Sequence, residues 1–409
     1  MKLMIAWISV LLLFVPIVFG EELPVLIEIA IRQNPKIQAE RKNWEATIAK
    51  YPQAIALPDP MVMYGFYAKS VETRVGPQRH RISISQTVPY PGMLKTAGKL
   101  VEKEVEVAQK KFEIVVRDVV ADLKIAYHEL AYLDQAIDLT GKNQQLLEHY
   151  LAITAKRYAN ETATLMDLIR AESQIAQLSF DLVLLQELKH VGMAKINALL
   201  DRPTETPIEN TILFETEPPE ISVSKLEILA IQNRQEIQIT DLQIEKLNET
   251  ATMVKLQNKP MINLNLMTIE TRKSTMEVAG NGKNPWIVGF SFSLPWGKLH
   301  RNDSRIRSVA LNRDHQIDSK KAIQNQTKAE VNRFYFQIKN SERLIELYQK
   351  TLIPQAERTI EAIDQTGNIT ELLEAQSIWL NFHLAWVRAI ADHHQDSARL
   401  QRLIGKEIR

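Results

Sequence analysis

The sequence predicts a mainly α-helical protein with a small β part and an internal duplication. Long stretches place apolar residues at steps of three and four, as the helices of a coiled coil do. Four shorter segments alternate apolar and polar residues, as strands do whose two faces meet different surroundings. Several sequence blocks also occur twice in the same order. Together these patterns indicate long coiled-coil helices with a few strands in each half.

The first 20 residues, "MKLMIAWISVLLLFVPIVFG", have the pattern of a secretory signal peptide. One lysine precedes an apolar run, and the last residues suit cleavage after Gly20. An uncleaved membrane anchor is the alternative, because the run approaches the length that spans a bilayer. Pro16 and the short basic flank favour the signal peptide. No later segment reaches ~18 uninterrupted apolar residues, so we expect no further transmembrane helix.

Three pairs of similar blocks follow one another in the same order in the two halves of the chain. They are "IAIRQNPKIQ" from Ile29 and "LAIQNRQEIQ" from Leu229, "ISISQTVPYPG" from Ile82 and "VGFSFSLPWG" from Val288, and "LMDLIRAES" from Leu165 and "ITELLEAQS" from Ile369. We therefore predict two repeats of the form helix–hairpin–helix–helix, residues 21–203 and 224–409. The segment between them, residues 204–223, is rich in Pro, Thr and Glu and is predicted to be a linker.

Each repeat is predicted to begin with a helix, followed by a β-hairpin and two long helices. The first repeat has a helix over Leu23–Ile55, strands over Met61–Lys69 and Arg79–Tyr90, and a long helix after Gly92 that a break at "TGKN", residues 140–143, separates from a helix reaching toward Leu200. The second repeat has a helix over Ser224–Gln257, strands over Met261–Arg272 and Trp286–Trp296, and a chain reversal at Pro354.

Proline and glycine mark the predicted passages from strand to helix. These residues are Pro89, Pro91, Gly92, Pro295 and Gly297. Proline ends a strand ladder because it has no N–H to donate. Glycine permits a sharp change of chain direction. Turns of an ordinary soluble fold use the same residues, so the pattern alone does not show whether the strands belong to a membrane barrel or to a soluble sheet.

The second hairpin is apolar on one face and polar on the other. The apolar face of its second strand carries Trp286, Val288, Phe290, Phe292 and Leu294. Strands of about ten residues with this alternation and with aromatic ends suit a barrel in an outer membrane, where the apolar face meets lipid. The alternative is a soluble sheet packed on the helices. Coiled-coil packing already uses the apolar helix faces, however, and four strands cannot close a barrel, whereas three chains supply twelve.

The composition excludes several kinds of protein. Lys and Arg number 50 and Asp and Glu 49, so no net charge favours nucleic acid as a partner. The chain has no cysteine, which rules out disulfides and thiolate metal sites. Neighbouring His393 and His394 diverge on a helix and are expected to be surface residues and not metal ligands. No catalytic motif is present, so we predict neither an enzyme nor a cofactor.

The chain resembles the TolC-like outer-membrane efflux proteins. The resemblance rests on the duplicated helix–hairpin–helix–helix layout, on "ISISQTVPYPG" with "SFSLPWG", and on "RYANETATLMDLIRAES". It implies a homotrimer with a shared twelve-stranded β-barrel in outer-membrane lipid and a helical barrel in the periplasm. It also implies a passive exit duct that works with a periplasmic adaptor and an inner-membrane efflux pump. A soluble periplasmic coiled-coil scaffold or adaptor-like protein is the alternative.

Two carboxylates near the start of the last helix are candidate selectivity residues. Glu371 and Glu374 lie three residues apart and therefore on one helix face. The resemblance implies a role for them, because members of that family carry acidic residues at the matching places, where they narrow the periplasmic entrance and favour cations. A trimer would gather six such carboxylates. Asp167, in the matching block of the first half, is a weaker candidate for the same gate. The alternative is an ordinary solvated helix surface.

Overall fold

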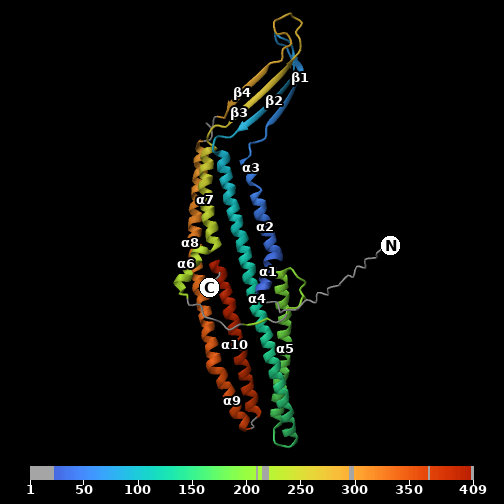
Figure 1. Cartoon of the computed structure of the whole chain (residues 1–409), viewed down its shortest axis with the longest axis vertical. Coiled ribbons are helices and arrows are strands. Elements are labelled where there is room, and N and C mark those ends of the chain that lie inside the picture. Colours follow the sequence, from blue (N-terminus) through green and yellow to red (C-terminus); the bar gives the residue numbers. More distant parts are fainter. Residues whose placement is uncertain (1–22, 209–210, 214–220, 294–298, 367–368, 407–409) are drawn as a thin grey trace, which may run out of the picture. The chain divides into compact units, whose positions relative to one another are not determined.

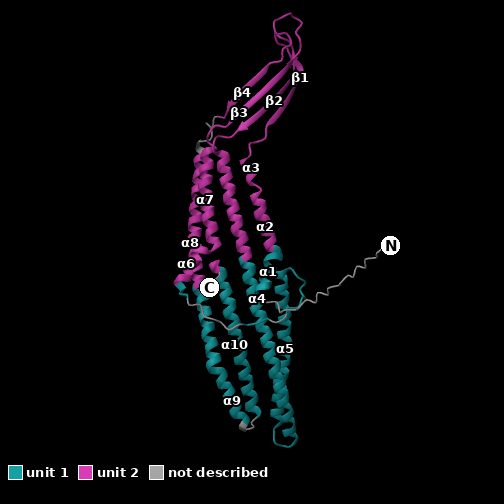
Figure 2. Ribbon diagram, in the orientation of Figure 1, with its two compact units in different colours: residues 1–35, 117–223, 332–402 teal, residues 36–116, 224–331, 403–409 magenta. Residues whose placement is uncertain are grey.

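A computed structural model describes the chain except for residues 1–22, 209–210, 214–220, 294–298, 367–368 and 407–409 (Figure 1). The predicted signal peptide, part of the predicted linker, and Leu294, Pro295 and Gly297 lie outside the described residues. The chain divides into two compact units (Figure 2). Unit 1 contains residues 1–35, 117–223 and 332–402, and unit 2 contains residues 36–116, 224–331 and 403–409. Both units therefore draw on both halves of the sequence.

The described residues are mainly helical, as predicted. The helices are α1 (Leu23–Gln33), α2 (Pro35–Ile48), α3 (Tyr51–Ile55), α4 (Met93–Ala159), α5 (Leu165–Leu200), α6 (Val223–Asn233), α7 (Gln235–Leu256), α8 (Leu299–Leu347), the π-helix η2 (Tyr348–Leu352), α9 (Ile353–Thr366) and α10 (Ile369–Ile404). The same order of helices, hairpin and long helices occurs twice along the chain. No helix in the described ranges combines the length and the apolar character needed to cross a bilayer.

The first helix of each half is interrupted where one uninterrupted helix was predicted. Pro35 begins α2, because proline has no N–H to continue the hydrogen-bond ladder of α1. At the matching place in the second half, Arg234 has an extended backbone between α6 and α7. Its guanidinium donates to Thr327 Oγ1 of α8 at 2.8 Å. A tertiary contact therefore accompanies the second break, where the sequence has no proline.

The predicted break at residues 140–143 is wrong. Helix α4 continues through this stretch to Ala159. A single glycine inside a helix costs only about 1 kcal/mol, and nothing crowds Gly141. The helix ends instead near Glu161, which has a left-handed backbone with φ 59°. Thr164 then caps α5. Buried apolar side chains on either side of this stretch, Ala136 and Leu147, hold the helix in place and outweigh its weak propensity.

The predicted reversal at Pro354 is also wrong. Helical turns continue without a gap from α8 through the π-helix Tyr348–Leu352 into α9. Pro354 is the second residue of α9, just after this wider turn. A π-turn changes the hydrogen-bond pattern locally, so the helix absorbs the missing N–H of proline without ending. Helix α10 begins only at Ile369.

Unit 2 contains one antiparallel sheet in the order β1-β2-β3-β4. The strands are β1 (Met61–Val71), β2 (Gln78–Val88), β3 (Ile262–Thr271) and β4 (Trp286–Phe292). The four predicted strands are thus confirmed, although β4 is seen only to Phe292. The two hairpins join through β2 and β3, in which Ile84 is paired with Leu266 (Figure 1). One strand from each half therefore forms the middle of the sheet.

Candidate functional site

One face of the sheet carries an uncovered apolar surface. Pairing places Val62, Ile84, Leu266 and Val288 in one row across all four strands. These side chains are 66%, 49%, 43% and 83% exposed. Neighbouring rows on the same face add Ile82, Ile262, Leu264, Trp286, Phe290 and Phe292, which are also exposed. We call this set of residues the apolar sheet face.

The opposite face of the sheet is mostly polar. One row consists of Met61, Ser85, Asn265 and Gly289, and a second contains Thr87, Asn263 and Ser291. Because strand side chains alternate with a period of two, most apolar residues of the sheet lie on one side, although Met61, Met63, Met267 and Ile287 lie on the opposite face. The structure places Trp286, Val288, Phe290 and Phe292 together on the apolar sheet face, as the alternation requires. Their contact with lipid stays a prediction.

Both outer strands of the sheet have an unpaired edge in the described part of the chain. Strand β1 pairs only with β2, and β4 pairs only with β3. Exposed edges of this length invite pairing with further strands. No described helix packs over the apolar sheet face, whose side chains remain solvent-accessible. The alternative of a soluble sheet resting on its own helices therefore has no support in the single chain.

The passage from β2 to α4 follows the predicted residues. Strand β2 ends at Val88, just before Pro89, and α4 begins at Met93, just after Gly92. Gly92 has φ +93°, a conformation that side-chain-bearing residues rarely adopt. Its carbonyl accepts a hydrogen bond from Thr96 Oγ1 at 2.9 Å. Proline ends the strand and glycine redirects the chain.

Asp167 stabilises the start of α5 through a capping box. The Asp167 N–H donates to Thr164 Oγ1, and the Thr164 N–H donates to Asp167 Oδ2 at 2.9 Å. Thr370 Oγ1, in the first turn of α10, donates to Asp167 Oδ1. The hydrogen bonds from Thr370 and Thr164 lower the pKa of this carboxyl group to about 2. The first turns of α5 and α10 are thereby linked within unit 1.

Glu371 and Glu374 lie on the exposed side of the first turns of α10. Leu372 and Leu373, between them in sequence, are buried on the other side. Glu374 Oε1 lies 4.0 Å from Arg170 Nη1, and both side chains are more than half exposed. Such a pair contributes little to stability. The gate role of Glu371, Glu374 and Asp167 therefore stays a prediction, beside the capping role that Asp167 already has.

Sequence reasoning missed two residues in this cluster. Arg170 follows Asp167 by three residues, so helix spacing alone places both on one face, and this signal was available. Thr370 reaches Asp167 from 203 positions away in the sequence, and no local pattern indicates that contact.

Replacing Asp167 with alanine is expected to loosen the start of α5. The substitution removes the capping box and the link to Thr370, at a cost of about 1 kcal/mol to local stability. Hydrogen exchange of the amides of residues 165–170 should become severalfold faster, while exchange near Leu130 stays unchanged. Replacing the exposed Glu172 is the matched control. Equal protection in the Asp167 variant and the wild type would contradict the capping role.

Histidines come together in unit 1 at a place that the sequence did not predict. The rings of His128 in α4 and His394 in α10 stack with centroids 4.5 Å apart. The adjacent rings of His393 and His394 stand at 88° to each other. Burial lowers the pKa of His128 to about 3 and that of His393 to about 4, with the neighbouring His394 adding to both effects. His393 is buried, contrary to the expected surface position. No group of three or more His, Asp or Glu side chains in the described ranges is arranged to hold a metal.

Comparison with known proteins gives both a sequence match and several structural matches. Residues 228–406 match the model of the outer membrane efflux protein family. Curated protein sequences give no match. The outer membrane protein VceC of Vibrio cholerae is 16% identical, with 95% of this chain and 97% of that one covered and a TM-score of 0.77. CusC, whose structures concern transmembrane channel formation, is 14% identical over 95% and 93% of the chains, with a TM-score of 0.79. The CmeC outer membrane channel of Campylobacter jejuni is 13% identical over 94% and 86%, with a TM-score of 0.76.

The structural matches cover nearly the whole chain at low sequence identity, so they concern the fold. They confirm the predicted fold class, with long coiled-coil helices and strands of the kind that outer-membrane channels contribute to a β-barrel. The family match concerns most of the predicted second repeat, which carries β3, β4 and the helix with Glu371 and Glu374. Through the match of residues 228–406, the predicted resemblance to the TolC-like outer-membrane efflux proteins is confirmed, and with it the predicted place of the chain in the outer membrane.

Proposed function

We propose that the protein is the passive exit duct of a tripartite efflux system and acts as a homotrimer. Substrates would arrive from an inner-membrane pump through a periplasmic adaptor, and the duct itself would carry out no chemical step. The proposal is supported by the family match of residues 228–406 and by the likeness of the fold to outer-membrane channels.

The observation that carries this proposal is the apolar sheet face between two unpaired strand edges. Backbone groups at an open edge cannot stay unpaired in lipid, so a sheet in a membrane has to close on itself. Four strands per chain are too few to close. Three copies joined from β4 of one chain to β1 of the next supply twelve strands and leave no edge. The exposed apolar side chains would then face lipid, and the polar rows would face the duct.

Membrane extraction and mass measurement test this function against the alternative of a soluble periplasmic scaffold. We expect the protein to stay with outer membranes through a high-salt wash, to require detergent for release and to have the mass of three chains. A monomer released by salt would overturn the proposal. Purification from detergent after cross-linking should also recover an adaptor and an inner-membrane pump. Their absence, with a trimer present, would remove the tripartite part of the proposal and leave the channel.

Replacing both Glu371 and Glu374 with glutamine is expected to weaken the preference of the channel for cations. In a trimer the double substitution removes six negative charges from the predicted entrance. The cation-to-anion permeability ratio in planar bilayers should fall by roughly tenfold at low salt and by less at high salt, where charges are screened.

The matched control for this change is the double replacement of Glu28 and Glu45. Both are exposed helix-surface residues outside the predicted entrance, and their replacement changes the net charge by the same amount. An unchanged permeability ratio in the Glu371 and Glu374 variant, or an equal loss in the control, would contradict an acidic entrance.

A further inference from the structure

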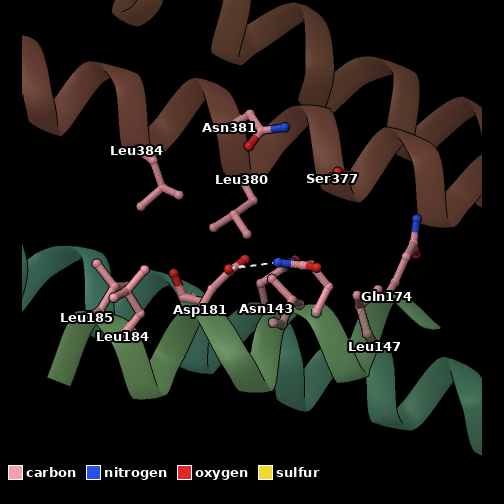
Figure 3. A pocket seen from close by; sticks show the side chains of 13 residues that line it. Asn143, Leu147, Gln174, Asp181, Leu184, Leu185, Ser377, Leu380, Asn381 and Leu384 are labelled. Atoms are coloured by element: carbon pink, nitrogen blue, oxygen red, sulfur yellow. Dashed lines mark hydrogen bonds between the residues drawn. The ribbon is translucent and has the colours of Figure 1, made fainter. Parts of the chain in front are cut away.

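A cavity of about 390 Å³ lies between α4, α5 and α10 inside unit 1 (Figure 3). Its size is within the range of small-molecule sites in proteins. Leucines form much of its wall, and they are Leu147, Leu178, Leu184, Leu185, Leu380 and Leu384. The buried cluster of Leu147, Ala171 and Leu373 holds the three helices together at one end of it. The cavity therefore has a supported apolar wall.

Unpartnered polar atoms distinguish this cavity from an ordinary packing gap. Thr140 and Asn143 are only 2% and 3% exposed, and both line the cavity. Thr140 Oγ1, Asn143 Oδ1 and Gln174 Oε1 are buried without a hydrogen-bond partner in the described chain. A buried acceptor left without a donor costs about 1–3 kcal/mol. Three such oxygens around one cavity indicate a place for a ligand that donates hydrogen bonds.

The charge of the cavity wall is also uncompensated. Asp181 is its one charged lining residue among those that the structure describes. Gln177 donates to Asp181 Oδ1 at 2.9 Å, and no cationic side chain of the described residues pairs with this carboxylate. The Asp181 carboxylate lies along the same wall as Asn143 (Figure 3). A bound cation that donates hydrogen bonds would neutralise the Asp181 carboxylate and satisfy the unpartnered oxygens of the cavity wall.

We propose that this cavity binds an amphipathic organic ammonium ion that carries a second hydrogen-bond donor. The ammonium group would lie at Asp181 and Asn143, and the apolar body would lie against the leucines. Gln174 lies two helical turns, about 10 Å, from Asp181. A second donor about 8 Å from the ammonium group spans this distance, because a hydrogen bond at each end adds to the reach of the ligand. The site lies inside one chain and does not depend on the proposed efflux function.

Binding of tyramine to the purified, detergent-solubilised protein tests the proposal. Tyramine has an ammonium group, an aromatic body and a phenolic donor at its far end. We expect saturable binding of one molecule per chain by calorimetry. Phenethylamine lacks the phenolic donor, and 4-ethylphenol lacks the ammonium group. Each should bind about tenfold more weakly, which corresponds to about 1.4 kcal/mol.

Two substitutions should each remove one of these preferences. Asp181→Asn removes the charge, so tyramine should lose its advantage over 4-ethylphenol and keep its advantage over phenethylamine. Gln174→Leu removes the far acceptor and should have the reverse effect. Asp138→Asn is the matched control, since Asp138 is exposed, pairs with Lys142 and does not line the cavity. Absence of saturable binding, or the same affinities in wild type and both variants, would overturn the proposal.

The Asn143→Leu variant distinguishes a cavity that binds a ligand from a cavity that a neighbouring subunit fills. Removing an unpartnered buried acceptor should raise the melting temperature of the ligand-free protein and weaken tyramine binding about tenfold. If a neighbouring subunit instead supplied the missing donors, the same change would lower the melting temperature and weaken the trimer. That outcome would also overturn the proposal, because the cavity would then be filled by protein.

Discussion

Phe290→Arg is expected to remove most of the protein from the outer membrane. Phe290 is 75% exposed on the apolar sheet face of unit 2, in the row shared with Gln86 and Leu264. An arginine facing lipid costs about 2–4 kcal/mol near the middle of a bilayer. A trimer carries the substitution three times, so the assembled barrel should lose several times that amount. Quantitative immunoblotting of outer-membrane fractions measures the loss.

Ser291→Arg is the matched control for this prediction. Ser291 is the next residue in β4 and lies on the opposite, polar face of the sheet. Both side chains are exposed in the single chain, so neither substitution should disturb packing inside one copy. Near-normal membrane levels of the Ser291 variant, together with loss of the Phe290 variant, would show that the polar face lines the duct and that the apolar sheet face meets lipid. Equal levels of the two variants would contradict that assignment.

Acidification is expected to destabilise unit 1 through its buried histidines. His128 has a pKa of about 3 in the folded protein, against an ordinary value of 6.5. The unfolded chain therefore binds one more proton between these two values. The stability contributed by neutral His128 is fully present above pH 6.5 and is lost progressively as the pH falls toward 3. At pH 5 this histidine alone should lower the free energy of unfolding by about 2 kcal/mol. His393 should act in the same direction, down to about pH 4.

His128→Phe tests the pH dependence because it keeps a ring between α4 and α10 and removes the titrating group. The fall in the urea midpoint between pH 7 and pH 5, measured by circular dichroism in detergent, should be clearly smaller in this variant than in the wild type. His149→Phe is the matched control, since His149 lies on the same helix and is exposed. A variant that loses as much stability as the wild type on acidification would assign the effect to other groups.

The sheet was predictable from the sequence to a greater extent than the helix ends. Alternation between apolar and polar residues is a local signal, and it gave the strands as well as the shared face of Val288 and Phe290. The break predicted around Gly141 gave too much weight to one glycine. The stronger signal for a helix boundary lies in "TLMD", where Thr164 and Asp167 have the spacing of a capping box. A capping box marks the start of a new helix, so α4 has to end before it. At Pro354 a π-turn compensates for proline, and no sequence pattern indicates such a turn.

The candidate sites show where sequence reasoning ends. Glu371 and Glu374 could be placed on one helix face by spacing alone, because three residues make almost one turn. The contact between Asp167 and Thr370 and the stacking of His128 on His394 depend on how distant helices pack, which no local pattern contains. The same holds for the unpartnered oxygen of Asn143, since its burial results from three helices meeting.

The pairing of β2 with β3 has an evolutionary consequence. The middle of the sheet joins one hairpin from each half of the chain, so a half-length ancestor would have offered only two strands. Six copies of such an ancestor would have been needed to supply the twelve strands of the proposed trimer. Gene fusion would have turned half of the contacts between those copies into covalently linked ones. After such a fusion, each of the two hairpins would be free to accumulate its own substitutions, and the sixfold symmetry of such a ring would become threefold.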